Sequence, residues 1–219
     1  MASHKKASDI ENGLKKCRTY WDERAGLDAS ETEKVEMSPR TQACRFEMFL
    51  RDHDIAGKRI LEVGCGTGGF YKHLLKRNIE CHYEGFDLSP QMVELCRGFF
   101  PGIPFYHGDV LKWETDEPFD YTVSFAIHNI KIPQGWEILQ AVTRRQFELC
   151  RVAAHLSILT DRFQGFGEKI QAWRAEDVLT FALSLTPYVD LRHSYLPNDF
   201  NLTLYREPLI DTCKDLMLE

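Results

Sequence analysis

The feature that most constrains this chain is a dense set of glycines directly after a short apolar run, in residues 60–70, Ile-Leu-Glu-Val-Gly-Cys-Gly-Thr-Gly-Gly-Phe. Ile60, Leu61 and Val63 are typical of a short strand that is buried on both faces. The glycines allow a turn with positive φ angles, and they let a ligand approach the backbone closely. Residues 70–76 then show apolar side chains at helical spacing. The run predicts a strand, a tight turn and the start of a helix.

The glycine spacing fits two kinds of nucleotide-binding loop. Glycines at 64, 66 and 69 fit Gly-x-Gly-x-x-Gly, the fingerprint of dinucleotide-binding folds. Glycines at 64, 66 and 68 fit Gly-x-Gly-x-Gly, and Glu62 stands two residues before the first of them. In either case, backbone N–H groups at the helix start would face a polar or anionic ligand group. The loop alone leaves both types of cofactor open.

A carboxylate follows the loop at a separation that is typical of nucleotide-binding βαβ units. A second predicted strand, 81–87, ends in Asp87, which lies 23 residues after Gly64. A βαβ unit places an acid at about this separation against the hydroxyls of a bound ribose. Ser89 and Pro90 then predict the start of the next helix, with the serine as N-cap and the proline in the first turn.

Two further predicted strands also end in polar residues. The first, 103–110, contains Gly108 and Asp109 at its end, and the second, 119–126, runs into a loop that contains His128. In doubly wound sheets the ligand binds outside the carboxyl ends of the strands. The ends of four predicted strands are therefore expected to converge on one crevice.

The rest of the chain alternates predicted helices and strands. A helix over 136–152, a strand over 155–160, a helix over 176–185 and a strand over 188–195 follow in order. Residues 200–205 then alternate polar and apolar side chains, which is typical of an antiparallel partner. We therefore predict an α/β fold with a Rossmann-like, doubly wound, seven-stranded sheet that is closed by an antiparallel C-terminal hairpin.

The first 40 residues are expected to form a helical segment outside the main domain, which we place at 41–219. Residues 9–24 have helical character, and 28–40 are acidic and irregular, as in a mobile connection. Tyr20 and Trp21 are large aromatic residues in a charged neighbourhood. They either anchor the helix to the core or cover the mouth of the site as part of a lid.

Composition narrows the class of partner. A net charge of −6 over 219 residues gives no electrostatic basis for binding nucleic acid or an anionic membrane. The seven cysteines contain no Cys-x-x-Cys pair, which argues against a disulfide framework and against a zinc site, so no metal is expected. No apolar run reaches the length of a membrane span, and no signal segment begins the chain. We expect a cytoplasmic protein with a small-molecule partner, and the sequence leaves its oligomeric state open.

Together, Glu62 with its glycine loop, Asp87, Gly108-Asp109 and the terminal hairpin resemble the class I S-adenosylmethionine-dependent methyltransferases, over about residues 40–206. A narrower likeness is to bacterial members that act on small molecules. The resemblance implies S-adenosyl-L-methionine as cofactor and S-adenosyl-L-homocysteine as product. The Asn/Asp-Pro-Pro-aromatic signature of nucleic-acid enzymes is absent after the fourth strand, so we expect a small-molecule acceptor methylated at oxygen or nitrogen.

The resemblance implies a set of cofactor-binding residues: Arg45, Glu62, Gly64, Cys65, Gly66, Thr67, Gly68, Asp87, Leu88, Met92, Asp109, Val110, Phe125 and Ala126. Asp87 is expected to hold the ribose, Met92 to lie against adenine, and Asp109 to accept from the adenine amino group. Arg45 either offers a planar fork of donors to the methionine carboxylate or is a surface or capping residue.

Candidate catalytic residues are His128, His193 and Tyr195. His128 follows the fourth strand, where an imidazole of ordinary pKa would take a proton from an acceptor hydroxyl or amine. His193 and Tyr195 share one face of the sixth strand by alternation, and they are candidates for secondary polar contacts. For each of the three, the alternative is a packed or surface residue without a chemical role.

Two other functions remain compatible with the sequence. A NAD-dependent oxidoreductase shares the glycine loop, but it would more naturally lack the closing hairpin and the Gly-Asp strand end. A catalytically silent S-adenosylmethionine-binding module would show the same binding residues. Methyl transfer from a sulfonium needs little acid–base machinery, because alignment supplies much of the acceleration, so the lack of an obvious catalytic pair does not favour silence.

Overall fold

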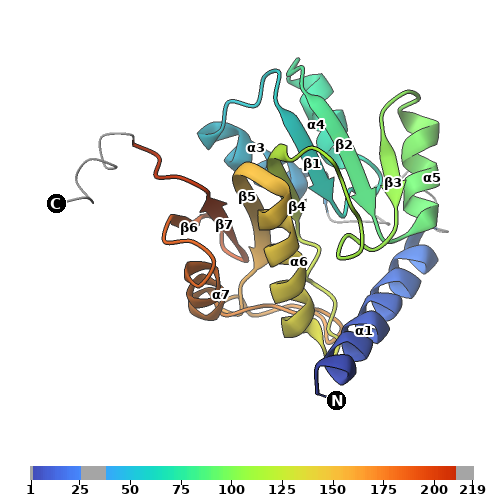
Figure 1. Cartoon of the computed structure of the whole chain (residues 1–219), viewed down its shortest axis with the longest axis vertical. Helices are drawn as coiled ribbons and strands as arrows, with labels where there is room; N and C mark the ends of the chain where they lie inside the picture. The colour runs from blue at the N-terminus through green and yellow to red at the C-terminus, as the bar shows by residue number, and fades with distance from the viewer. Residues whose placement is uncertain (1, 26–37, 211–219) are drawn as a thin grey trace.

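A seven-stranded sheet forms the centre of the computed structural model, which describes residues 2–25 and 38–210 (Figure 1). Its strands are β1 (Arg59–Val63), β2 (His82–Asp87), β3 (Phe105–His107), β4 (Phe119–Phe125), β5 (Cys150–Leu159), β6 (Val189–Leu196) and β7 (Asp199–Tyr205). Their order is β3-β2-β1-β4-β5-β7-β6. The first five strands pair in parallel, and β7 pairs antiparallel with both β5 and β6. The predicted fold class is confirmed.

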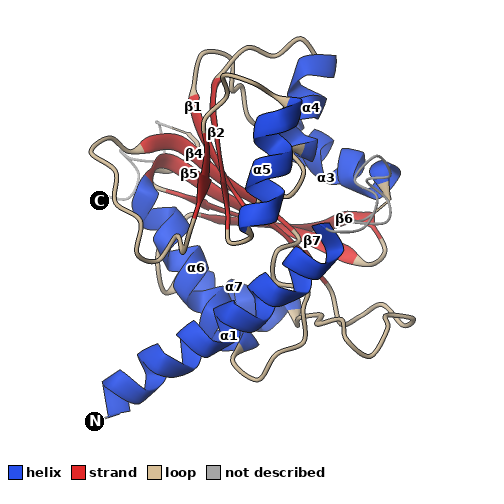
Figure 2. Cartoon of the chain, turned by 90° about the vertical axis from the view of Figure 1, so that its right-hand side faces the viewer, coloured by secondary structure: helices blue, strands red, loops and turns tan. Residues whose placement is uncertain are grey.

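Helices cover both faces of the sheet, because successive residues of each buried strand point to opposite sides. On one face lie α3 (Pro39–Asp52), α4 (Gly69–Lys76) and α5 (Pro90–Phe99), and on the other lie α6 (Gly135–Leu149) and α7 (Ala175–Leu183) (Figure 2). Ile60 of β1 packs in the first layer with Phe46 and Phe70. Its neighbour Leu61 packs in the second layer with Ile138 of α6.

Two helices begin with a serine cap, and the second of these starts is the one predicted at Ser89 and Pro90. The Ser38 hydroxyl accepts from the Thr41 N–H at 3.4 Å, with Pro39 in the first turn of α3. The Ser89 hydroxyl accepts from the Met92 N–H at 3.2 Å at the start of α5. Each cap satisfies a backbone donor that has no partner within the helix.

The N-terminal helix α1 (Ala2–Ala25) lies across the end of the sheet (Figures 1 and 2). It contacts α5, which covers one face, and α6, which covers the other. At the crossing with α6 stands Gly13, where a Cβ would lie 2.6 Å from Ile138 Cδ1. Farther along, Asp22 Oδ1 accepts from the Ser89 hydroxyl at 2.6 Å. The predicted helix over 9–24 is confirmed. Most of the predicted connection 28–40 lies outside the described residues, and the division at residue 40 stays a prediction.

The largest differences from the predicted boundaries are at the junction of α6 with β5 and at β3. The helix expected over 136–152 ends at Leu149, and the residues after it begin β5. A buried helix and a buried strand present the same apolar residue types, so the apolar pattern could not mark the change. The third strand was expected over 103–110, but β3 contains only Phe105–His107. It is an edge strand that pairs over three positions with the end of β2.

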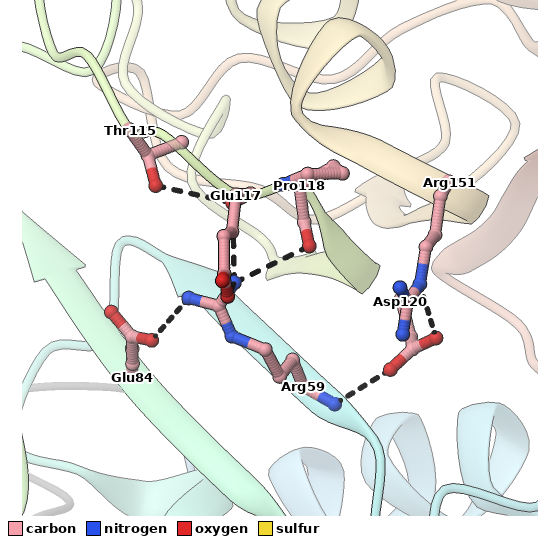
Figure 3. A network of polar contacts seen from close by, with 7 residues as sticks. All are labelled: Arg59, Glu84, Thr115, Glu117, Pro118, Asp120 and Arg151. Carbon is pink, nitrogen blue, oxygen red and sulfur yellow. Dashed lines mark hydrogen bonds and ion pairs between the residues drawn. The ribbon is translucent and has the colours of Figure 1, made fainter.

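The amino ends of the strands carry a charged network centred on Arg59 (Figure 3). The Arg59 backbone N–H donates to Asp120 Oδ2 at 2.8 Å, and its guanidinium donates to Glu84 Oε1 at 2.9 Å and to Glu117 Oε2 at 3.1 Å. Arg151 Nε donates to Asp120 Oδ1 at 2.8 Å. These contacts join β1, β2, β4 and β5 at the end of the sheet opposite to the predicted crevice.

Candidate functional site

A cavity of about 360 Å³ opens at the carboxyl ends of β1, β2 and β4, with α1 along one side. This volume is in the range of small-molecule sites. Its wall contains most of the residues predicted to bind a cofactor: Arg45, Glu62, Gly64, Cys65, Gly66, Asp87, Leu88, Met92, Asp109, Val110, Phe125 and Ala126. The expected convergence of strand ends is therefore found, although the function of these residues is a separate question.

The glycine loop makes the tight turn that its composition predicts. Gly64 and Gly66 have φ angles of +76° and +52°, which residues with a Cβ rarely adopt. The Gly64 N–H donates to the Phe86 carbonyl at 2.7 Å, which holds the loop to β2. A Cβ at position 64 would lie 2.2 Å from Ile127 Cγ2. Thr67 and Gly68, also predicted to bind cofactor, are not in the cavity wall, whereas Gly69 and Phe70 at the start of α4 are.

Asp87 is held rigidly at the end of β2. Its Oδ2 accepts from the Gly66 N–H at 2.9 Å, and its Oδ1 accepts from the Ser89 N–H at 2.8 Å. An ionised carboxylate has about four lone-pair positions, so both oxygens can accept a further bond from a ligand. The side chain therefore joins the glycine loop to the start of α5 and still presents acceptors to the cavity.

Two other carboxylates stand in the same wall. The Tyr83 hydroxyl donates to Glu62 Oε2 in the buried end of β1, and burial raises the pKa of this tyrosine well above its ordinary value. Asp109 Oδ1 accepts from the Leu111 N–H at 3.0 Å. The three acids face one cavity, which favours a ligand rich in hydrogen-bond donors or positive charge.

The loop after β4 begins at Ala126, whose φ of +63° is uncommon for a residue with a Cβ. Next along the chain, His128 Nε2 and Asn129 Oδ1 are buried and have no hydrogen-bond partner among the residues that the structure describes. The two residues are 7% and 8% exposed and both line the cavity. Buried polar groups without partners cost stability, so they are uncommon outside functional sites.

His128 does not have the ordinary pKa that the sequence analysis assumed. Burial lowers the pKa of its imidazole from 6.5 to about 4. The charged form is disfavoured because the ring has left water and has no charged partner to compensate. The side chain is therefore neutral at neutral pH, and one of its ring nitrogens is a hydrogen-bond acceptor.

Arg45 is in the wall but already forms a buried ion pair. Its Nε donates to Asp199 Oδ2 at 2.9 Å, and its Nη2 donates to the same oxygen. The two side chains are 1% and 0% exposed. Burial raises the pKa of Asp199, and the guanidinium charge opposes this rise. The alternative of a surface residue is wrong, and a contact between Arg45 and a cofactor carboxylate stays a prediction.

His193 and Tyr195 are not in the cavity wall. His193 is exposed on β6, and its ring centre lies 6.4 Å from that of Phe200. The Tyr195 hydroxyl contacts Asp199 Oδ1 and, at 2.7 Å, Asn201 Oδ1. Strand alternation predicts which residues share a face, but it does not reveal that β6 is the outermost strand, beyond β7. Tyr195 contacts Asp199, which in turn pairs with Arg45 in the cavity wall.

Several lining residues were missed by the sequence analysis: Leu14, Cys17 and Arg24 of α1, Phe166 and Ile170 of the segment after β5, and Asn198 between β6 and β7. The residues of α1 share one helical face with Trp21, and this spacing was a usable signal. Phe166 stands between two glycines, which was a weaker one. Tyr20 and Trp21 also line the cavity, as a lid requires, but movement of α1 stays a prediction.

We expect the protein to lose stability as the pH falls from 6.5 to about 4. The unfolded chain binds a proton at the ordinary histidine pKa of 6.5, whereas folded His128 binds it only near pH 4. The stability present above pH 6.5 is therefore lost progressively, by about 3 kcal/mol for this residue. Burial lowers the pKa of His53 and His155 as well, which adds in the same direction. Urea unfolding across this pH range measures the loss.

The variant His128→Gln isolates the contribution of this one side chain, because glutamine stays neutral throughout. Its unfolding free energy should fall less steeply with pH than that of the wild type. Identical slopes for the two proteins would show that His128 is not the titrating group.

Comparison with known proteins gives one matching domain family and relatives that are similar over part of their length. Residues 60–146 match a family model described as a methyltransferase domain. Phthiotriol/phenolphthiotriol dimycocerosates methyltransferase 1 of Mycobacterium ulcerans (strain Agy99) is 41% identical over 93 residues, which are 39% of this chain and 34% of that protein. Fatty-acid O-methyltransferase of Mycolicibacterium smegmatis is 31% identical over 86 residues, 38% of this chain and 30% of that protein. The chain matches about a third of the length of these relatives.

A solved structure covers more of the chain. Magnesium protoporphyrin IX methyltransferase from Synechocystis PCC 6803, with bound SAH, aligns with a TM-score of 0.61 over 86% of this chain and 93% of that one. The sequence identity is 14%, so this likeness shows a shared fold. Nowhere in residues 2–25 or 38–210 is there a helix with the length and apolar character needed to cross a membrane.

Proposed function

We propose that this chain is a class I S-adenosylmethionine-dependent methyltransferase, and that it binds S-adenosyl-L-methionine in the cavity and methylates a small molecule at oxygen or nitrogen. The observation that most directly supports this is the meeting of the glycine loop with Glu62, Asp87 and Asp109 in one wall. The proposal includes a cytoplasmic location and no nucleic-acid or membrane partner, in line with the charge and cysteine usage of the sequence.

The chemistry of this wall fits the groups of the cofactor. Its ribose hydroxyls, adenine amino group and ammonium group are donors, and carboxylates are acceptors. Asp87 would hold the ribose, Asp109 the adenine amino group and Glu62 the ammonium group. At Gly64 a Cβ would lie 2.2 Å from Ile127 Cγ2, so the glycine lets the Ile127 side chain pack directly on the loop.

When bound, S-adenosylmethionine supplies a methyl group that is already activated by a positively charged sulfur. The residues of the chain then have to align the acceptor and remove its proton. His128 is the proposed proton acceptor, because burial lowers its pKa to about 4 and keeps the ring neutral, and because Nε2 has no partner among the described residues. A hydroxyl becomes strongly acidic as its oxygen is methylated, so a weak base is sufficient.

We propose that the acceptor is largely apolar. Apart from the acids and the His128–Asn129 loop, much of the wall is aliphatic or aromatic, including Leu14, Trp21, Ile138, Phe166 and Ile170. By name, the two relatives act on phthiotriol or phenolphthiotriol dimycocerosates and on fatty acids. Fatty acids are apolar over most of their length, which is consistent with such a wall.

Calorimetric titration with S-adenosylhomocysteine and with NAD tests the cofactor. Binding of S-adenosylhomocysteine supports the proposal, and binding of NAD alone would replace it with the oxidoreductase alternative. Methyl-labelled S-adenosylmethionine incubated with metabolite and lipid extracts then tests turnover. A labelled product supports the enzyme, whereas binding without any product across the extracts would favour a silent binding module.

We expect Asp87→Ala to weaken the binding of S-adenosylhomocysteine by about 1–3 kcal/mol, because hydrogen bonds to a charged acceptor are lost. Calorimetry measures the affinity, and circular dichroism checks that the variant is folded. Glu94→Ala, on the exposed face of α5 and outside the cavity wall, is the matched control and should bind like the wild type. Unchanged affinity in Asp87→Ala would remove this residue from the cofactor site.

A further inference from the structure

The segment between β5 and α7 carries a pair of aromatic rings at the edge of the cavity. Phe166 is in the cavity wall, and Phe163 is 37% exposed. Their ring centres lie 5.0 Å apart. All the other residues of 161–169 are charged residues, glutamine or glycine, and all of them are exposed. The two rings therefore form one apolar surface, within a polar segment, that begins in the cavity wall and ends in solvent.

The end of this segment is fixed to the loop that contains His128. Ile170 forms an isolated antiparallel bridge with Ile130, and both residues are in the cavity wall. The Trp173 indole N–H donates to the His128 carbonyl at 2.9 Å. Because His128 is the proposed proton acceptor, the aromatic pair is attached to the part of the wall where the methyl acceptor would react.

The backbone of the segment gives no local reason for two large rings. Single exposed apolar side chains are ordinary on protein surfaces, and Phe163 alone would need no explanation. Its partner Phe166, however, stands between Gly165 and Gly167, and Gly165 has a φ of +120°, which residues with a Cβ rarely adopt. A ligand that left the cavity along this path would cover both rings and remove the exposed ring from water.

The size of the cavity makes such a path necessary for a long acceptor. The cavity has a volume of about 360 Å³. Sites for a single drug-sized ligand begin at about 300 Å³. A bound cofactor would therefore fill most of the space and leave room for little more than the reacting end of an acceptor. The rest of a longer molecule has to lie outside, and the ring pair is an apolar surface that continues from the wall.

We propose that Phe166 and Phe163 bind the alkyl chain of the methyl acceptor, and that this acceptor is an amphiphile with its reacting group in the cavity and its chain extending to the surface. The proposal rests on the proposed methyltransferase function and specifies its substrate class. Phe166 contacts the part of the chain that leaves the cavity. Phe163 contacts only a chain that is long enough to reach it, so it is a specificity residue for chain length.

The test uses para-ethylphenol, para-butylphenol, para-hexylphenol and para-octylphenol as ligands of the protein saturated with S-adenosylhomocysteine, by calorimetry. We expect the affinity of the wild type to rise about two- to fourfold for each added methylene, up to the octyl chain. Phe163→Ser should bind para-ethylphenol like the wild type and para-octylphenol about tenfold more weakly. Phe163→Leu, which keeps an apolar side chain, should retain most of the increase.

Phe99→Ser is the matched control. Phe99 is 51% exposed and packs on the neighbouring ring of Phe100, as Phe163 packs on Phe166, but it is outside the cavity wall. This variant should show the same dependence on chain length as the wild type.

Three results would overturn the proposal: no binding of any alkylphenol, a wild-type affinity that stops rising at the butyl chain, or the same dependence on chain length in Phe163→Ser as in the wild type. The thermal midpoint of Phe163→Ser should equal that of the wild type, because the ring is exposed. A lowered midpoint would show that the ring supports the fold and would count against the proposal. Failure of the wild type to bind S-adenosylhomocysteine is the separate result that removes the proposed function itself.

Discussion

Replacing Arg45 by methionine is expected to lower the free energy of unfolding by about 3–5 kcal/mol. The change leaves the Asp199 carboxylate, which is 0% exposed, without the guanidinium that donates to its Oδ2. Breaking a buried pair from one side costs this much because the remaining charge must be neutralised or must stay in a medium of low polarity. Urea unfolding at neutral pH, followed by circular dichroism, measures the loss.

Two further variants separate the ion pair from general damage. Arg45→Met combined with Asp199→Leu should recover a large part of the loss, because removing both charges leaves no uncompensated group. Lys112→Met breaks an exposed pair, in which Nζ lies 2.9 Å from Glu11 Oε1, and should leave the unfolding midpoint where it is. If the single and double variants were equally unstable, the loss would come from packing around Arg45 and not from the buried charge.

The second large effect is on the rate of methyl transfer, which His128→Ala is expected to lower by about 10²–10⁴. The proposed reaction needs a group that takes the acceptor proton, and His128 lines the cavity, with its Nε2 buried and without a partner in the described chain. Because burial lowers the pKa of this histidine to about 4, the wild-type rate should stay level as the pH falls from neutral through 6.5 and should decline only near pH 4. Initial rates with labelled S-adenosylmethionine measure both effects.

His193→Ala is the matched control, since the same side chain is removed from an exposed position outside the cavity wall. Its rate should equal that of the wild type, and both variants should bind S-adenosylhomocysteine normally. A rate for His128→Ala within about threefold of wild type would make a proton-accepting role untenable. A decline of the wild-type rate centred near pH 6.5 would contradict the buried, neutral state of the ring.

The parts of the site that the sequence predicted are those determined by local pattern. Glu62, Gly64 and Gly66 follow an apolar strand within a few residues, and Asp87 ends the next strand, so parallel pairing alone brings them together. The turn from α6 into β5 at Cys150 was missed, because the choice between helix and strand there depends on pairing with β4.

Features that depend on contacts between distant segments could not be predicted. Arg45 and Asp199 are 154 residues apart, and the sequence around each residue contains no pattern that would predict their ion pair. The lowered pKa of His128 likewise depends on burial by segments such as the one that contains Trp173, whose indole N–H donates to the His128 carbonyl. Sequence pattern gave the place of this histidine in the loop but not the environment that alters its chemistry.

The place of β7 has a consequence for how the chain is made. β7 lies between β5 and β6 in the sheet, yet it follows β6 in the chain, and within residues 2–25 and 38–210 the strand that pairs with β6 is β7 alone. As the polypeptide grows from its N-terminus, the edge of β5 therefore has no partner of its own until Asp199–Tyr205 have left the ribosome. An unpaired edge is a template for pairing with strands of other chains. During synthesis, the strand that ends this exposure is also the one that delivers Asp199 to Arg45.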